Sequence, residues 1–226
     1  MTELAHHSTD YSVVESEAPQ VMARNLRIAS KLWASSAVFF FFAFLFAYFY
    51  LRSLNSQGLW HPHNVKAPVG LGTLIAACVV VSAAAAYYGA RRLESGDESA
   101  WQRFGLGALV FGLAAVVLQI VEWSMLGFGP TNGGFASVFL GWTGLYCLFV
   151  FGTMYWLETL VATSFRYSGA GAAGHEPGEA SGDVERTGDD IHRPLSLVAP
   201  GASAFAFYWV VLAGIGVVTW LILYLL

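Results

Sequence analysis

Two carboxylic acids lie inside the long apolar stretches of this sequence, Glu122 and Glu158. An ionisable group within hydrocarbon is costly unless it meets water or a polar partner, so each is a functional candidate. Gln119 comes three residues before Glu122, which places both side chains on one face of a helix. This pair could form a buried polar anchor, contact a lipid headgroup or belong to a proton path. The structural alternative is a glutamate that reaches the headgroup region from its helix end.

Glu158 follows Tyr155 and Trp156 and is interpreted as a carboxylate at the membrane interface. The sequence has no Ser-His-Asp set, phosphate-binding loop or metal motif, so we expect no catalytic, cofactor-binding or metal residues. The two cysteines, Cys78 and Cys147, both fall in apolar stretches and are read as small packing residues.

All six histidines lie outside the apolar stretches, so haem or copper cannot be held inside a bilayer by histidine ligation. Of these, His61 and His63 share a loop, but no neighbouring cysteine or carboxylate completes a metal site. The other four are His6, His7, His175 and His192. We therefore expect no haem or copper bound inside the bilayer by this chain.

Five long apolar segments must position these residues. They cover 32–51, 69–90, 104–126, 135–162 and 203–226. Each reaches about 20 residues, the length that crosses a bilayer as a helix. A chain that is 56% hydrophobic and 12% charged has too little polar surface for a water-soluble domain. Because lipid-exposed backbone must bond within its own segment, the sequence predicts an all-α polytopic membrane protein, a bundle of five transmembrane helices.

The basic residues predict an orientation. Nine of the eleven lysines and arginines fall on one side of the predicted membrane, and only Arg52 and Lys66 on the other. This bias predicts an N-terminus inside and a C-terminus outside. The expected location is the cell inner (plasma) membrane. The expected organisation is a cytoplasmic tail (1–29), helices 1–4 (30–165), a flexible cytoplasmic linker (166–200) and helix 5 (201–226). The linker is rich in Gly, Ala, Glu, Asp and Ser.

Four groups of residues, taken in order, carry a family resemblance. They are the aromatic run 39–50 before Trp60-His61-Pro62, the helix end Gln119-Ile120-Val121-Glu122-Trp123, the stretch Asn132-Gly133, Phe135, Ser137, Phe139 and Thr143-Gly144, and the pair Tyr208-Trp209. In order and spacing they resemble subunit III of haem–copper respiratory oxidases, of the short five-helix bacterial type. The family's first two helices have no counterpart.

Several polar positions of that family differ in this chain. Ala37 stands where the family has a glutamate, and Tyr87-Tyr88 replace paired histidines. The segments 143–150 and 208–213 likewise lack histidines of the family pattern. The chain therefore looks like a divergent member.

The resemblance implies a noncatalytic subunit of a terminal respiratory oxidase (cytochrome c oxidase) in aerobic electron transport. Its implied partners are a haem-bearing catalytic subunit and phospholipids, with no nucleic acid. In such a complex the haem and copper are expected in partner subunits, and this chain is expected to hold no cofactor. The implied roles are complex stability, lipid binding and support of proton uptake. One alternative is the similar accessory protein of nitric oxide reductase or the matching quinol oxidase subunit. An alternative of another class is a small proton-coupled transporter that uses Glu122.

Overall fold

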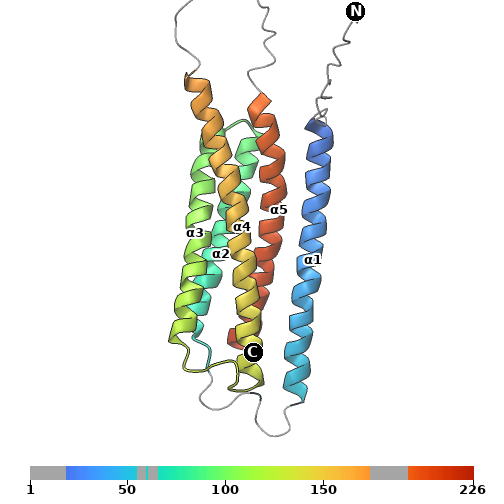
Figure 1. Cartoon of the computed structure of the whole chain (residues 1–226), viewed down its shortest axis with the longest axis vertical. Coiled ribbons are helices and arrows are strands. Elements are labelled where there is room, and N and C mark those ends of the chain that lie inside the picture. Colours follow the sequence, from blue (N-terminus) through green and yellow to red (C-terminus); the bar gives the residue numbers. More distant parts are fainter. Residues whose placement is uncertain (1–18, 55–59, 61–65, 174–192) are drawn as a thin grey trace, which may run out of the picture.

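Five long helices make up the computed structural model, which describes residues 19–54, 60, 66–173 and 193–226. The helices run alternately up and down as one bundle (Figure 1). They are α1 (Pro19–Ser53), α2 (Val69–Glu94), α3 (Glu98–Met125), α4 (Gly134–Ala173) and α5 (Arg193–Trp220), and α5 continues into the π-helical turn η1 (Leu221–Leu225). All five are long and apolar enough to cross a membrane. The predicted all-α, five-helix membrane fold is confirmed.

Three helices extend into the regions that were expected to be the tail and the linker. α1 begins at Pro19 within the expected tail, α4 continues to Ala173 and α5 starts at Arg193, both within the expected linker. A helix that has formed gains one hydrogen bond for each added residue, so it can extend beyond the apolar stretch through good helix formers such as Ala, Leu and Arg. Residues 1–18 and 174–192, which hold the rest of the expected tail and linker, lie outside the described residues.

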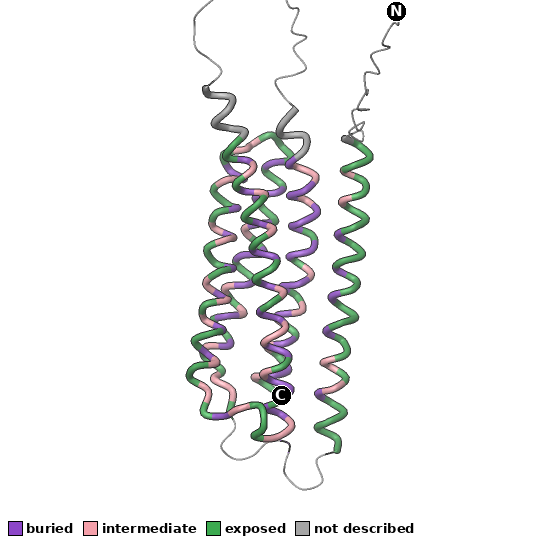
Figure 2. The backbone as a smooth tube through the Cα atoms, viewed as in Figure 1, coloured by how far each residue is buried: buried purple, intermediate pink, exposed green. Residues whose placement is uncertain are grey.

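Helices α2 to α5 pack around a shared interior, and α1 stands at the edge of the bundle against α5 and α4. Figure 2 shows the difference: buried residues follow the inner faces of α2–α5, whereas most of α1 is exposed. The interior is aromatic, and its largest fully buried side chains include Trp101, Trp142, Trp209 and Phe139. Such rings supply much of the packing area between helices that gain little from the hydrophobic effect in lipid.

One buried serine joins three of the helices. The Ser82 hydroxyl of α2 donates a 2.6 Å hydrogen bond to the Ala108 carbonyl of α3, and it accepts a 3.1 Å bond from the Trp209 indole N–H of α5. Because Ser82 is fully buried, neither polar group that it meets has water as an alternative partner. This pair of bonds fixes the relative rotation of α2, α3 and α5.

A tight turn connects α2 to α3. Gly96 adopts φ 88°, a left-handed conformation that favours glycine, and Asp97 then caps the N-terminus of α3. The Asp97 carboxylate accepts 3.0 Å hydrogen bonds from the Ala100 backbone N–H and the Ser99 hydroxyl. These bonds stabilise the charged form and lower the pKa of the Asp97 carboxyl group. The charged Asp97 thus lies in the turn, beyond the apolar parts of α2 and α3.

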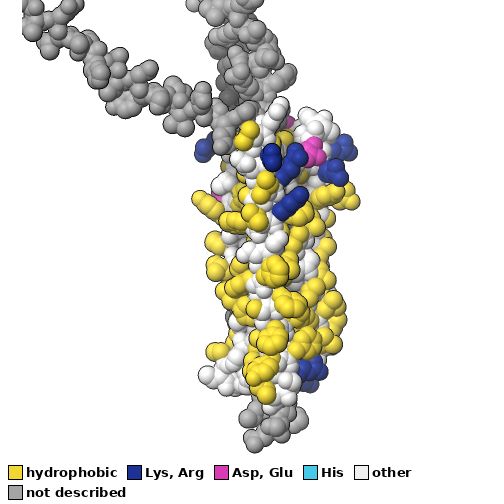
Figure 3. Space-filling view, turned by 90° about the vertical axis from the view of Figure 1, so that its right-hand side faces the viewer, with side chains coloured by type: hydrophobic (Ala, Val, Ile, Leu, Met, Phe, Trp, Pro, Cys, Tyr) yellow, Lys and Arg dark blue, Asp and Glu magenta, His cyan; other side chains and the backbone are white. Residues whose placement is uncertain are grey.

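The sides of the bundle carry hydrophobic side chains over most of their length, and basic residues gather toward one end (Figure 3). That end is where α1 and α3 begin and where α2 and α4 finish. Basic residues of this end include Arg24, Arg27, Lys31, Arg91, Arg92, Arg103 and Arg166, and α5 begins here at Arg193. Arg52 and Lys66 belong to the opposite end. We refer to these as the basic end and the opposite end of the bundle.

Candidate functional site

Glu122 lies on α3 near the opposite end and is completely buried. Its carboxylate accepts a 2.6 Å hydrogen bond from the Gln119 side-chain amide, one turn earlier on the same helix. Its two oxygens also lie 2.7 and 2.8 Å from the Tyr224 hydroxyl, which comes from η1 at the end of the chain. Through these bonds Glu122 connects α3 to η1. Both partners are neutral donors.

Tyr224 reaches Glu122 because α5 ends in a π-helical turn. A π turn holds one residue more than an α turn, and successive residues advance by about 100° around the axis, so the turn re-aims every later side chain. The Tyr224 ring then packs over Gly72 of α2, where any Cβ would overlap it. It also meets Phe139 of α4 edge to face, with ring centroids 5.5 Å apart. Three helices, α2, α3 and α4, thus contact this one tyrosine.

A second polar bond between helices follows directly after Glu122. The Trp123 indole N–H of α3 donates to the Thr143 hydroxyl of α4 at 3.1 Å, and Thr143 donates in turn to the Phe139 carbonyl at 2.7 Å. The helix end that the sequence singled out therefore bonds to η1 through Glu122 and to α4 through Trp123.

Sequence reasoning identified Gln119 and Glu122 but missed Tyr224. No local sequence signal marks the π turn that aims Tyr224 at Glu122. The third candidate, Glu158, is exposed on α4 toward the basic end, while Glu122 lies toward the opposite end. The structure thus brings Gln119 and Glu122 together and keeps Glu158 apart from them.

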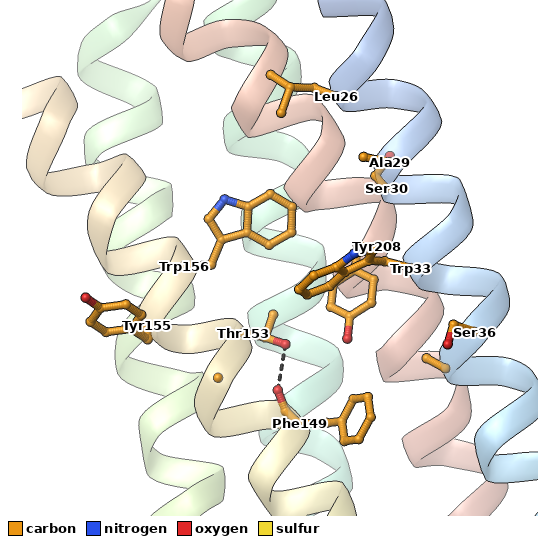
Figure 4. A pocket seen from close by; sticks show the side chains of 12 residues that line it. Leu26, Ala29, Ser30, Trp33, Ser36, Phe149, Thr153, Tyr155, Trp156 and Tyr208 are labelled. Carbon is orange, nitrogen blue, oxygen red and sulfur yellow. Dashed lines mark hydrogen bonds between the residues drawn. The ribbon is translucent and has the colours of Figure 1, made fainter. Parts of the chain in front are cut away.

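A groove of about 670 Å³ runs between α1 and α4 in the half of the bundle near the basic end (Figure 4). Trp33 of α1, Trp156 of α4 and Tyr208 of α5 form its aromatic floor, with ring centroids 6.1–6.5 Å apart. Thr153 also faces the groove, but its hydroxyl donates to the Phe149 carbonyl at 2.7 Å. The remaining lining residues are Leu26, Ala29, Ser30, Ser36, Ala37, Phe149, Gly152 and Tyr155.

Metal-ligating side chains do not gather anywhere in the part of the chain that the structure describes: it contains no group of three His, Cys, Asp or Glu. Cys78 and Cys147 are free thiols on separate helices. All six histidines, including His61 and His63, fall outside the described residues.

These features define a class of protein: a polytopic helical membrane protein with a buried carboxylate and an apolar lateral groove. Comparison with known proteins then gives the family. The family model for cytochrome c oxidase subunit III matches residues 9–179. This chain belongs to the cytochrome c oxidase subunit III family, as the resemblance predicted.

Two curated relatives agree with this assignment. The chain is 29% identical over 141 residues to a cytochrome c oxidase subunit 3 of Pylaiella littoralis, which covers 60% of this chain and 52% of the relative. It is 28% identical over 128 residues to a probable cytochrome c oxidase subunit 3 of Nocardia farcinica, which covers 55% of this chain and 63% of the relative. The chain thus spans about half of the first relative and less than two thirds of the second.

Proposed function

We propose that this chain is a noncatalytic integral subunit of a cytochrome c oxidase complex in aerobic electron transport. The observation that carries the proposal is the subunit III family match over residues 9–179. The architecture supports it, because a bundle of five apolar helices is suited to packing beside another membrane protein. Within the described residues, Glu122 is the one fully buried carboxyl group. In this proposal the haem and copper centres belong to a catalytic partner subunit, which the present chain stabilises.

The groove between α1 and α4 supports a lipid-binding role. Its aromatic and aliphatic lining suits an acyl chain, and Arg24, Arg27 and Lys31 on the first turns of α1 lie toward the end at which a lipid phosphate would sit. We therefore propose that a phospholipid occupies this groove, with its headgroup at the basic end of the bundle.

The charge distribution supports an orientation. Basic residues of membrane proteins are enriched on the cytoplasmic side, so we propose that the basic end faces the cytoplasm and that the protein resides in the plasma membrane. We further propose that the subunit supports proton uptake from the cytoplasm indirectly, by stabilising its partner. Glu122 lies toward the opposite end and would not be part of that uptake route.

Affinity purification of the tagged chain from its native membranes in mild detergent tests the proposal. We expect a haem-bearing polypeptide to copurify in a fixed ratio, with haem absorbance in the complex. Oxygen consumption with reduced cytochrome c then distinguishes a cytochrome c oxidase from a quinol oxidase or a nitric oxide reductase. Copurification of only haem-free proteins, or haem bound to this chain alone, would overturn the proposal.

A further inference from the structure

A small hollow lies where four helices converge beside the Glu122 cluster. Its volume is about 20 Å³. The polar residues that line it are Gln119, Thr143, Tyr146, Thr219 and Tyr224, which come from α3, α4, α5 and η1, and Gly72 and Gly216 lie on its wall. We call it the junction hollow. A site that holds one water needs roughly 10–15 Å³ and two to four polar partners, and the junction hollow satisfies both requirements.

The hydroxyl hydrogens around the junction hollow are already used. Tyr146 donates to the Leu212 carbonyl at 3.1 Å, and Thr219 donates to the Ile215 carbonyl at 2.8 Å. Thr143 and Tyr224 donate to Phe139 and Glu122 as described above. Each hydroxyl oxygen still has lone-pair capacity. The hydroxyl groups can therefore act only as acceptors toward anything in the hollow.

Gln119 provides the complementary donor. Its side-chain amide has two N–H hydrogens, of which one is directed to Glu122 at 2.6 Å. The second N–H can be donated to an occupant of the hollow. An occupant that fits this pattern must accept one hydrogen bond and donate up to two, in the space of a single small molecule.

We propose that the junction hollow binds one internal water molecule, which accepts from Gln119 and donates to the hydroxyl oxygens of Tyr146 and Thr219. The water connects α3, α4 and α5 through groups that make no direct bond to one another. It also extends the Glu122–Gln119 pair into the centre of the bundle. Gln119 thereby links the Glu122 carboxylate to the water, while Tyr224 donates to the same carboxylate directly.

Two glycines preserve the space for this arrangement. A Cβ at Gly216 would overlap the Tyr146 hydroxyl, and a Cβ at Gly72 would overlap the Tyr224 ring. Each glycine lets a tyrosine approach a neighbouring helix backbone more closely than any other residue would allow. With larger residues at these positions both hydroxyl groups would be displaced, and the hollow would lose its polar wall.

A cryo-electron microscopy map of the protein purified with its native partners, at a resolution that shows ordered waters, tests the proposal. We expect a density peak about 2.7–3.2 Å from the Gln119 amide nitrogen and from the Tyr146 or Thr219 oxygen. An empty hollow in a map that shows internal waters elsewhere would overturn the proposal. So would a peak with the contacts of a metal ion, or side chains that close the space.

Two substitutions at one position provide a matched comparison. Thr219→Ser keeps the hydroxyl group, so the water peak should remain. Thr219→Val keeps the side-chain shape but removes an acceptor, so we expect loss of the peak and a lower thermal midpoint than for Thr219→Ser. Equal midpoints together with an unchanged peak in Thr219→Val would show that Thr219 does not hold the water and would contradict the proposed site.

Discussion

The Tyr224 hydroxyl lies 2.7 and 2.8 Å from the two carboxyl oxygens of Glu122. This contact joins the third helix to the last turn of the chain, across 102 residues of sequence. It gives a buried acid in a membrane bundle two neutral donors, Tyr224 and Gln119, which replace the water that it lacks. The contact thereby links the position of α3 to the ending of α5.

Glu122→Gln and Glu122→Leu should differ in their effect on assembly. The amide of Glu122→Gln can still accept from Tyr224 and Gln119, so we expect a mild effect. Glu122→Leu leaves both donors buried without an acceptor, at a cost of about 1–3 kcal/mol for each donor. We expect a lower thermal midpoint and less copurified haem-bearing partner, measured by gel filtration and absorbance. If neither substitution changes these quantities, Glu122 is not an anchor.

Gly72→Ala should displace Tyr224 because the new Cβ would overlap its ring. The expected result is a thermal midpoint close to that of Tyr224→Phe, which removes the hydroxyl that bonds Glu122. Gly70→Ala is the matched control on the same helix, since a Cβ there meets nothing within 4 Å. Equal midpoints for Gly70→Ala and Gly72→Ala would show that Tyr224 does not need this close approach.

Ser82→Ala removes the hydroxyl that joins α2, α3 and α5. The Trp209 N–H then has no acceptor, and hydrogen bonds inside membrane bundles contribute about 0.6–2 kcal/mol. We expect a lower midpoint in thermal unfolding, followed by the intrinsic fluorescence of the tryptophans. Ser164→Ala is the control, because Ser164 is equally buried but donates only within its own helix, to Val161. A midpoint for Ser82→Ala that is no lower than that of Ser164→Ala would contradict a joining role.

Gly152→Leu should fill the lateral groove, since Gly152 lines it and a Cβ there meets no neighbouring atom. We expect a loss of phospholipid that copurifies with the protein, measured by mass spectrometry of extracted lipid. Gly144→Leu adds the same side chain to the same helix outside the groove, and Gly144 likewise has open space around it. Equal lipid contents in the two variants would argue against a lipid in this groove.

Reporter fusions test the orientation inferred from the basic residues. A fusion after Asp183 should report the cytoplasm and a fusion after Leu226 the outside, because helix α5 crosses the membrane between these two positions. Reports from the same compartment would contradict the five-span topology. A reversal of both compartments would instead keep the five helices and overturn the orientation.

The sequence by itself determined that this is a membrane bundle of five helices. Apolar runs such as 69–90 and 104–126 are long enough to span a bilayer, and backbone in lipid must satisfy its hydrogen bonds within its own segment. The spacing of Gln119 and Glu122 was equally readable, because neighbours on one helix face depend only on helical periodicity. Family membership could also be inferred, since it depends on the order of short motifs.

The tertiary structure alone decided which groups meet across helices. Tyr224 reaches Glu122 through a π turn that no local sequence signal announces, and Gly72 provides the space for its ring. The Ser82–Trp209 bond likewise spans 127 residues. In a membrane bundle most of the inward-facing side chains are apolar, as are those that face lipid, so hydropathy alone does not distinguish faces that meet another helix from faces that meet acyl chains. Packing and interhelical hydrogen bonds make that choice, and both depend on the shape of all five helices together.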